Sequence, residues 1–334
     1  MLRMKNLTIK KVLLVIVGSF AAFILFQFLY PGNPDDLPPR GDPEILAHRG
    51  VHVNWKKGTY DWATGCEATH IYEPTHDYIE NTVESIAAAF AMGATIVEID
   101  VRRSSDDQLV VFHDWMLECR TDGQGQVSDH PLEYLKGLDI GYGYTHDGGR
   151  TYPFRGKGVG KMPTLVEVLR AFPDQKFLLD HKDGSMQTAE LLVDVLKALP
   201  PEQQARLYYW GPDETYAYVH EEVPAITRLF GTRRQVKAWF MPYLLSFGLS
   251  GFPEESRGLA IGMPAEYAPF LWGWPYRFLA KVSQAGAKFY LIVDTEEDAR
   301  AFSGIPVDGI VTDYIEVVGR YYTRRTSGRF PHRW

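Results

Sequence analysis

The chain has 334 residues, of which 45% are hydrophobic and 23% are charged. This composition excludes a largely disordered protein, and the length suits one large domain or at most two ordinary ones. The formal net charge is −7, from 42 acidic and 35 basic residues. That balance argues against nucleic acid as a partner, because proteins that bind it usually present a basic face.

The first predicted element is a membrane-spanning helix over residues 12–30, which carry no charge. At about 1.5 Å per residue, a helix of this length just crosses a hydrocarbon core of roughly 30 Å. Residues 1–11 are basic and acidic residues follow the helix, so the positive-inside rule predicts a cytoplasmic N-terminus. The rest of the chain is then expected outside, on the periplasmic or cell-surface side. A cleaved signal peptide is the competing interpretation, but no small-x-small motif ends the apolar run.

Residues 31–43 contain five prolines and two glycines and are expected to form an extended tether. Beyond it, short apolar runs alternate with helical patterns, which is typical of a parallel sheet covered on both faces. The predicted strands are residues 45–48, 95–102, 109–113, 176–181, 207–210, 225–230, 258–261, 289–293 and 309–312. The predicted helices include residues 82–92, 165–171, 186–199 and 295–301.

This alternation continues for more than 250 residues. Such a length favours a (β/α)8 TIM barrel, an α/β fold, over a short doubly wound sheet. A dinucleotide-binding fold would also need a GxGxxG turn after an early strand, and the sequence contains none. We therefore expect a barrel over residues 44–320, followed by a tail over residues 321–334.

Ionisable residues stand at the ends of several predicted strands. In a parallel barrel the carboxyl ends of the strands meet at the mouth, where catalytic groups collect. Glu98 and Asp100 alternate with aliphatic residues and share one face of their strand, and Asp180 ends a later strand. Three converging carboxylates suit a hard cation, Ca²⁺ or Mg²⁺, rather than zinc. A salt-bridged rim involving Arg102 or Arg103 is the structural alternative for the first two.

Two histidines and two cations complete this predicted site. His48 and His113 each follow an apolar strand core, and a pair of histidines can divide acid and base work near neutral pH. Arg49 and Lys182 supply the positive charge that a phosphate requires.

The ordered motifs resemble those of the glycerophosphodiester phosphodiesterases, relatives of the phosphatidylinositol-specific phospholipases C. They are His48-Arg49-Gly50, Glu80-Asn81-Thr82, Glu98-Ile99-Asp100, His113-Asp114, Asp180-His181-Lys182, and the closing residues Val307 to Tyr314. The resemblance implies a TIM barrel that hydrolyses glycerophosphodiesters to an alcohol and glycerol phosphate. By position it makes His48 and His113 the acid–base pair.

The same resemblance makes Glu98, Asp100 and Asp180 the metal ligands. Arg49 and Lys182 become the phosphate ligands. Glu80 is expected to orient His48 or Arg49, to cap the helix that begins near Thr82, or both.

Three features depart from the family pattern, and one of them is Leu291-Ile292-Val293-Asp294, which stands where the family often has W-T-V-N. Asp180 stands where the family usually has glutamate, so its carboxylate reaches about one methylene less far. The stretch between His48 and Glu80 is also longer than is common, and it contains an aromatic-rich insertion over residues 55–76. We interpret this insertion as a lid over the barrel mouth, although a plain surface loop remains an alternative.

Cys66, in this insertion, and Cys119 are the only cysteines. In an oxidising compartment they could form a disulfide, and two buried free thiols are the alternative.

The sequence thus predicts a membrane-anchored phosphodiesterase that acts on a small phosphodiester or a lysolipid with a divalent metal, and without nucleic acid. Two enzymatic alternatives keep this site but change the reaction: a lysophospholipase D, and a phospholipase-like lyase that would release a cyclic phosphate. A non-catalytic module that binds phosphorylated ligands is the third. Retention of both histidines and both ExD carboxylates argues against that module.

Overall fold

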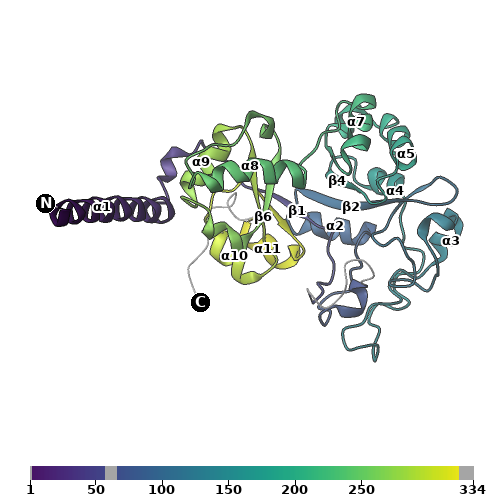
Figure 1. The fold of residues 1–334 in the computed structure, drawn as a ribbon. Helices are drawn as coiled ribbons and strands as arrows, with labels where there is room; N and C mark the ends of the chain where they lie inside the picture. Colours follow the sequence, from purple (N-terminus) through teal and green to yellow (C-terminus); the bar gives the residue numbers. More distant parts are fainter. Residues whose placement is uncertain (1, 57–65, 323–334) are drawn as a thin grey trace. The chain divides into compact units, whose positions relative to one another are not determined.

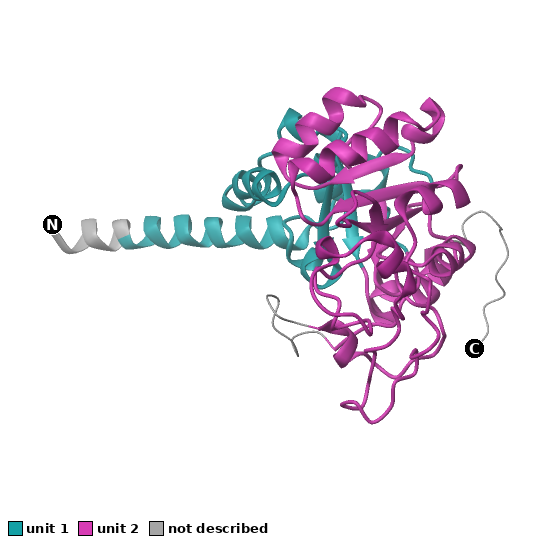
Figure 2. Cartoon of the chain, turned by 90° about the vertical axis from the view of Figure 1, so that its right-hand side faces the viewer, with its two compact units in different colours: residues 1–41, 230–292, 304–308 teal, residues 42–229, 293–303, 309–334 magenta. Residues whose placement is uncertain are grey.

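The computed structural model describes residues 2–56 and 66–322, with side chains from residue 10 onward (Figure 1). Residues 57–65 of the predicted lid and residues 323–334 of the predicted tail lie outside the described residues. The chain divides into two compact units, coloured separately in Figure 2. Unit 1 comprises residues 1–41, 230–292 and 304–308, and unit 2 comprises residues 42–229, 293–303 and 309–334.

Unit 2 contains five parallel strands and one antiparallel strand. The parallel strands lie in the order β5-β4-β2-β1-β8, and β3 pairs with β2 in the antiparallel sense. Their bounds are β1 Glu44–Ala47, β2 Ile96–Arg103, β3 Leu109–Val111, β4 Lys176–His181, β5 Leu207–Trp210 and β8 Gly309–Thr312. The register of β2 and β4 sets Asp100 opposite Asp180, so two carboxylates from different strands come to the same level.

Four helices of unit 2 begin directly after a residue whose side chain caps the helix. Thr82 caps α2, Thr164 caps α4 as part of a capping box, Ser185 caps α5 and Thr295 caps α10. The bounds are α2 Val83–Ala91, α3 Leu132–Gly137, α4 Leu165–Ala171, α5 Met186–Lys197, α6 Pro201–Gln204, α7 Asp213–Glu222, α10 Glu296–Phe302 and α11 Ile315–Tyr322. Two 3₁₀ turns, η2 Glu67–His70 and η3 Val127–Asp129, lie in the long connections.

Unit 1 contains the N-terminal helix and one parallel strand pair. Its elements are α1 Leu2–Leu29, η1 Pro34–Asp36, α8 Arg233–Leu245, η4 Glu254–Ser256, β6 Ala260–Pro264, η5 Ala265–Phe270, α9 Tyr276–Gln284 and β7 Lys288–Ile292. Within α1, residues Lys10–Leu29 are long and apolar enough to cross a membrane, with a mean hydropathy of 2.6.

Two segments differ from the sequence expectation. The stretch predicted as a strand over residues 225–230 forms only single bridges, from Thr227 to Tyr208 and from Phe230 to Ala260. The segment expected to be an extended tether includes the turn η1, and Arg40 pairs with Asp308 at 3.0 Å. Local proline content could not reveal this ion pair, because its two partners lie far apart in the sequence.

Candidate functional site

A buried carboxylate cluster lies at the ends of β2 and β4. Glu98 and Asp100 project from the same face of β2, and each is less than 5% exposed. Asp180 stands opposite Asp100 on β4. One oxygen from each of the three carboxylates lies within 4.8 Å of the other two. The three residues predicted as metal ligands therefore converge.

The Lys182 ammonium lies among these carboxylates, 2.7 Å from Asp100 Oδ1 and 2.5 Å from Asp180 Oδ2. Burial opposes its charge, but Asp100 and Asp180 outweigh this and raise the pKa of Lys182. Burial also opposes the charge of Asp100, and Lys182 and His113 nevertheless hold the pKa of that carboxyl well below its usual range. Burial, and then the charge of Asp100, raises the pKa of Glu98 well above its usual value. One ammonium thus faces three carboxyl groups.

The cluster fits a divalent cation bound through oxygen. Two oxygens that each lie about 2.4 Å from a shared Ca²⁺ can be at most about 4.8 Å apart, which matches this spacing. Among the residues described, Glu98 Oε1 is buried and accepts no hydrogen bond. Such an orphaned carboxylate oxygen is costly unless a cation or a proton satisfies it. Glu98, Asp100 and Asp180 are therefore the residues that would hold the metal.

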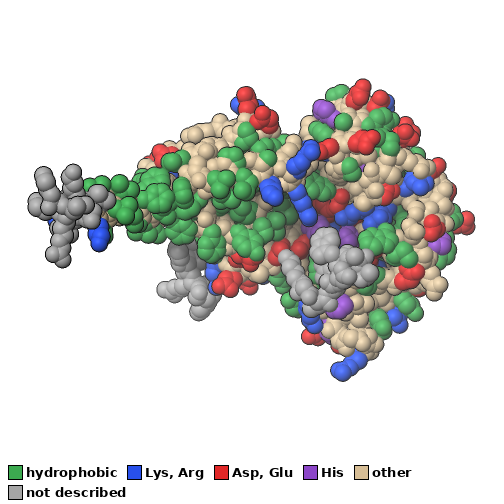
Figure 3. All heavy atoms as spheres, viewed as in Figure 1, with side chains coloured by type: hydrophobic (Ala, Val, Ile, Leu, Met, Phe, Trp, Pro, Cys, Tyr) green, Lys and Arg blue, Asp and Glu red, His purple; other side chains and the backbone are tan. Residues whose placement is uncertain are grey.

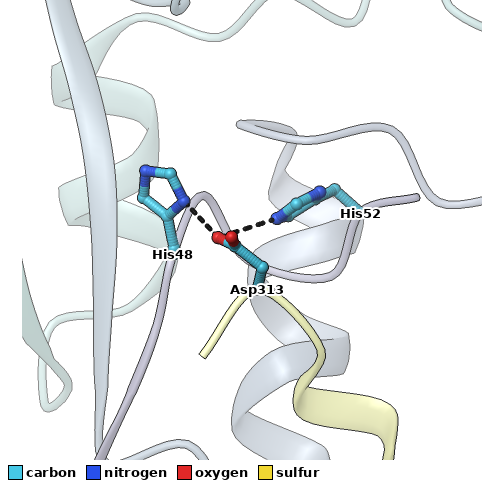
Figure 4. Close-up of side chains that lie close together, drawn as sticks. All are labelled: His48, His52 and Asp313. Atoms are coloured by element: carbon cyan, nitrogen blue, oxygen red, sulfur yellow. Dashed lines mark hydrogen bonds and ion pairs between the residues drawn. The ribbon is translucent and has the colours of Figure 1, made fainter. Parts of the chain in front are cut away.

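His48 lies beside this cluster and is oriented by an aspartate (Figure 4). Its Nδ1 is 2.5 Å from Asp313 Oδ1, while its Nε2 is 3.8 Å from Glu98 Oε2. Because the carboxylate accepts a hydrogen bond from Nδ1–H, Nε2 is the ring atom that can exchange protons with a ligand. The His48 side chain keeps 27% exposure, so it can be reached by a ligand.

A second histidine shares the same carboxylate. His52 is buried, and its Nε2 lies 3.7 Å from Asp313 Oδ1, on the opposite side from His48 (Figure 4). Burial opposes the charge of His52, but the interaction with Asp313 raises its pKa. Burial likewise opposes the charge of Asp313, and its two histidine partners hold the pKa of the carboxyl well below normal.

His113 is oriented in the same way. Its Nδ1 lies 2.6 Å from Asp114 Oδ1, and Arg120 Nε donates to the other oxygen of that carboxylate at 2.9 Å. Burial, and then the nearby Arg49 charge, lowers the pKa of His113, which keeps the imidazole neutral near pH 7. The Arg102 guanidinium donates to the His113 carbonyl at 2.6 and 2.8 Å, so Arg102 does not form the rim pair with Glu98 or Asp100 that we considered.

Arg49 lies in a buried ion-pair network rather than on an open surface. Its Nη1 donates to Glu67 Oε2 at 2.6 Å and to Glu80 Oε1 at 3.1 Å, and its Nε lies 3.5 Å from Asp100 Oδ2. Arg120 donates to the same two glutamates, at 2.7 and 2.8 Å. Glu80 thus pairs with two arginines and, within the described residues, forms no hydrogen bond or ion pair with His48. The cap of α2 is Thr82.

Cys66 and Cys119 form a disulfide with a Cα–Cα distance of 5.4 Å. Glu67 directly follows Cys66, and Arg120 directly follows Cys119. The side chains of Glu67 and Arg120 form an ion pair with each other at 2.7 Å. The covalent link and the ion pair therefore tie the inserted segment to the loop after β3, which carries His113.

The backbone is strained at one residue in each of the first two sequence motifs of the site. Arg49 has φ 57° and Asn81 has φ 59°, a region that non-glycine residues rarely adopt and that is often found at functional sites. Asn81 is held there by two contacts with Asp100, through its side-chain nitrogen at 2.6 Å and its oxygen at 3.2 Å. At Gly50, φ is 80° and a Cβ would lie 2.6 Å from Ser85 Oγ, so only glycine fits.

A cavity of about 510 Å³ borders this site within unit 2. Its lining residues are Val53, Asn54, Trp55, Tyr72, Glu73, Thr75, His76, Asp294, Thr295, Glu296, Tyr314 and Glu316. Trp55 stacks on His52 at 5.3 Å and lies 5.2 Å from the Arg49 guanidinium, so one ring touches both the site and the cavity. The walls combine aromatic rings with carboxylates.

The structure thus brings together all the residues that we predicted, and it adds others. Arg49 and Lys182 are the two whose surroundings differ from the expectation, because both cations are paired with carboxylates. The residues that the prediction missed are His52, Glu67, Asn81, Asp114, Arg120 and Asp313. Asn81, Asp114 and Asp313 stand inside the motifs quoted above, whereas no local pattern marks Glu67 or Arg120.

A family model matches residues 48–317, and its description is "Glycerophosphoryl diester phosphodiesterase family". A glycerophosphodiester phosphodiesterase from Caldanaerobacter subterraneus is 36% identical over 122 residues, which cover 36% of this chain and 46% of that relative. A lysophospholipase D from Homo sapiens is 26% identical, and the match covers 71% of this chain and 79% of the human protein. This chain therefore covers less than half of the first of these relatives.

A solved structure has a similar fold. It is the crystal structure of a glycerophosphoryl diester phosphodiesterase domain from Mycobacterium tuberculosis, with a TM-score of 0.62 and 22% identity. The match covers 84% of this chain and 99% of that domain. The predicted fold class is confirmed: a TIM-barrel-like α/β fold with one apolar N-terminal helix.

Proposed function

The chain belongs to the glycerophosphoryl diester phosphodiesterase family, and on that basis we propose that it hydrolyses glycerophosphodiesters to an alcohol and glycerol phosphate. The reaction would depend on a divalent metal, Ca²⁺ or Mg²⁺, and on two histidines as acid and base. The chain covers less than half of the first relatives it matches, so support for the reaction must come from the site itself.

One observation carries the proposal: two aspartate-oriented histidines lie around a cluster of three carboxylates. His48 is paired with Asp313, and His113 is paired with Asp114. In both pairs the aspartate accepts a hydrogen bond from Nδ1–H and holds the ring, so Nε2 can exchange protons with a substrate. If the two histidines had only a structural role, there would be no reason for them to lie beside a buried carboxylate oxygen without a hydrogen bond, such as Glu98 Oε1.

Acid–base catalysis divides between these two rings. One histidine takes the proton of the nucleophile, which is water or a glycerol hydroxyl, and the other protonates the departing alkoxide. A cation bound by Glu98, Asp100 and Asp180 would supply positive charge against the phosphoryl oxygens as charge develops there. The lowered pKa of His113 keeps this imidazole in the neutral form that can accept a proton at pH 7.

Lys182 and Arg49 supply the remaining positive charge. Lys182 is 17% exposed and carries three N–H donors on a flexible stem, so it can contact a phosphate while it stays near Asp100. Arg49 is more deeply buried, and its Nε has no hydrogen bond among the residues described. We assign Lys182 the direct phosphate contact, and we assign Arg49 a long-range electrostatic contribution together with the ordering of Glu67 and Glu80.

The alcohol half of the substrate is accommodated in the bordering cavity. Glu73, Glu296 and Glu316 among its lining residues make it unfavourable for a second anion. Trp55 and Tyr72 offer aromatic faces, which attract cations. An amino alcohol with a positive charge therefore suits this cavity better than an acidic or purely aliphatic one.

The proposed location is a membrane, with unit 2 on the extracytoplasmic side. The apolar span Lys10–Leu29 and the basic residues before it support this orientation. The Cys66–Cys119 bridge supports it independently, because disulfides persist in oxidising compartments and are rare in the cytosol.

Lysophospholipase D activity is the second candidate. A membrane anchor would hold the site near lysolipids, and the human relative carries that name. The two candidates share the site and differ in whether the glycerol of the substrate carries an acyl chain.

The deciding experiment uses the full chain in detergent micelles. Choline release from glycerophosphocholine and from lysophosphatidylcholine would be measured after EDTA dialysis and after adding Ca²⁺ or Mg²⁺. We expect turnover only with metal, and a loss of at least a hundredfold in His48→Ala and His113→Ala. His130→Ala, a histidine outside the site, is the matched control. Undiminished activity after EDTA and in His48→Ala would refute the metal–histidine proposal.

A further inference from the structure

The C-terminal half of α1 packs against the rest of unit 1. Phe20 and Phe23 meet the ring of Phe247 edge-on, at centroid distances of 5.8 and 6.4 Å. Phe28 meets Trp272 in the same way at 6.1 Å. These contacts begin inside the apolar span, well before its end at Leu29.

Hydrogen bonds fix the end of the helix at the same place. Arg277 Nη2 donates to the Gln27 carbonyl at 2.8 Å and to Gln27 Oε1 at 2.5 Å. The Arg277 amide donates to the Pro31 carbonyl at 2.7 Å. The helix therefore continues directly into the folded unit, and no free tether separates the two.

This packing sets a depth for Phe247. Phe20 precedes Leu29 by nine residues, which is roughly 13 Å along a helix axis. The whole span Lys10–Leu29 is only as long as the hydrocarbon core of roughly 30 Å. If α1 crosses the membrane along this span, a residue that touches Phe20 must lie below the lipid headgroups. Phe247 is such a residue.

The loops around Phe247 present apolar side chains outward. We call Leu244, Leu245, Leu249 and Phe270 the α8 tip, with exposures of 39%, 71%, 59% and 69%. The two loops that carry it are packed together, because Trp272 Nε1 donates to the Leu244 carbonyl at 3.2 Å and the Trp272 ring lies 5.5 Å from Phe247. Figure 3 shows the hydrophobic side chains that cover α1.

The charges on α8 are separated from this apolar end. Arg233 and Lys237 are exposed in the first half of the helix, whereas the second half, from Met241 to Leu245, has no charged residue. An apolar end that follows a basic stretch is the pattern of a helix whose tip enters lipid while its cations stay near anionic headgroups.

We propose that the α8 tip is inserted into the lipid bilayer beside α1, so that unit 1 is embedded at the membrane interface and not held away from it. The occupant of this surface is the acyl region of the lipid. An apolar patch of this kind is unfavourable in water and favourable in lipid, and its continuity with α1 fixes its depth. The inference rests on α1 as a membrane span and is independent of the reaction.

The test measures depth with a fluorophore on the full chain in vesicles of phosphatidylcholine and phosphatidylglycerol. Leu245→Cys and Leu249→Cys would carry an environment-sensitive label, since both native cysteines are bridged. Val159→Cys is the matched control in unit 2, with an exposure of 58% against 59% for Leu249. Leu14→Cys reports on α1 itself. Doxyl-labelled lipids would then quench the labels that lie in the bilayer.

We expect the labels at Leu245, Leu249 and Leu14 to shift to the blue and to be quenched severalfold more than the label at Val159. Quenching at Leu14 without quenching at Leu245 would overturn the proposal, because α1 would span while the tip stayed in water. A blue shift at Leu245 without lipid quenching would also overturn it, since another protein or a second copy would then cover the tip. Absence of quenching at every site would overturn it as well.

Discussion

Arg120 Nη2 lies 2.7 Å from Glu67 Oε2, and each of these residues directly follows one cysteine of the Cys66–Cys119 bridge. Arg120 also binds Asp114, the carboxylate that orients His113, so two side-chain contacts lead from the residue after Cys119 to a proposed catalytic ring. The disulfide in the inserted segment is therefore expected to help hold His113 in its position in the site.

The double variant Cys66→Ser/Cys119→Ser should lose both stability and activity. The bridge closes a loop of 53 residues, for which chain entropy gives about 4 kcal/mol of unfolding free energy. Urea unfolding and the choline-release assay would measure the two losses. Dithiothreitol should reproduce them in the wild-type chain and change nothing in the variant; an inactivating effect of the reductant on the variant would contradict this coupling.

Asp313→Asn should reduce turnover roughly a thousandfold or more, because the amide NH2 group can donate to His48 Nδ1 and so favour the tautomer that carries its proton on Nε2, which cannot act as a base. His52→Gln is the comparison, since His52 contacts the same carboxylate from its other side and, in the described part of the chain, forms no ion pair with Glu98. Steady-state kinetics should show a much smaller effect there. Equal losses in the two variants would mean that Asp313 acts mainly as a structural residue.

Asp180 should bind metal despite its short side chain. We expect Asp180→Glu to retain metal-dependent activity, and Asp180→Ala to need a roughly tenfold or higher Ca²⁺ concentration for half-saturation. The rise in melting temperature with Ca²⁺ reports this affinity without requiring turnover. Asp174→Asn, at an exposed carboxylate, is the control. An unchanged Ca²⁺ titration in Asp180→Ala would remove this residue from the ligand set.

Glu67 should make stability depend on pH in the acid range. Burial opposes its charge, but Arg49 and Arg120 lower the pKa of Glu67 to about 2 in the folded chain, from an ordinary value near 4.5. Its contribution is therefore complete above about pH 4.5 and is lost as the pH falls toward 2. The loss amounts to no more than about 3 kcal/mol.

Glu67→Gln should flatten the dependence of the melting temperature on pH over this window and lower the melting temperature at pH 7. Glu133→Gln, an exposed glutamate, should leave the wild-type profile intact. A wild-type profile that is level between pH 4.5 and pH 3 would contradict the assignment.

The strand-borne part of the site could be predicted from sequence because strand periodicity determines it. Glu98 and Asp100 alternate with aliphatic residues, and parallel pairing then sets Asp180 opposite Asp100 without any help from loops. The same reasoning located His48 and His113, because both directly follow apolar strand cores. The helix starts at Thr82, Thr164, Ser185 and Thr295 could likewise be predicted, since local capping chemistry determines them.

The loop-borne part could not be predicted in this way. Glu67 and Arg120 meet only because two long loops are folded over one another, and no periodicity encodes such a contact. Arg49 was expected to face a phosphate, but two glutamates from outside its own strand take up its donors. The disulfide was left open for the same reason, because sequence alone does not measure the separation of two cysteines.

The contacts of α1 also bear on how this protein can be prepared. A chain shortened to begin at residue 44 would leave the rings of Phe247 and Trp272 without Phe20, Phe23 and Phe28. Arg277 would lose its Gln27 partner, and Asp308 would lose Arg40. Removal of α1, the usual route to a soluble enzyme, would thus expose an aromatic surface to solvent. We expect the shortened chain to aggregate through this surface. Solubilisation of the intact chain in mild detergent is the better preparation.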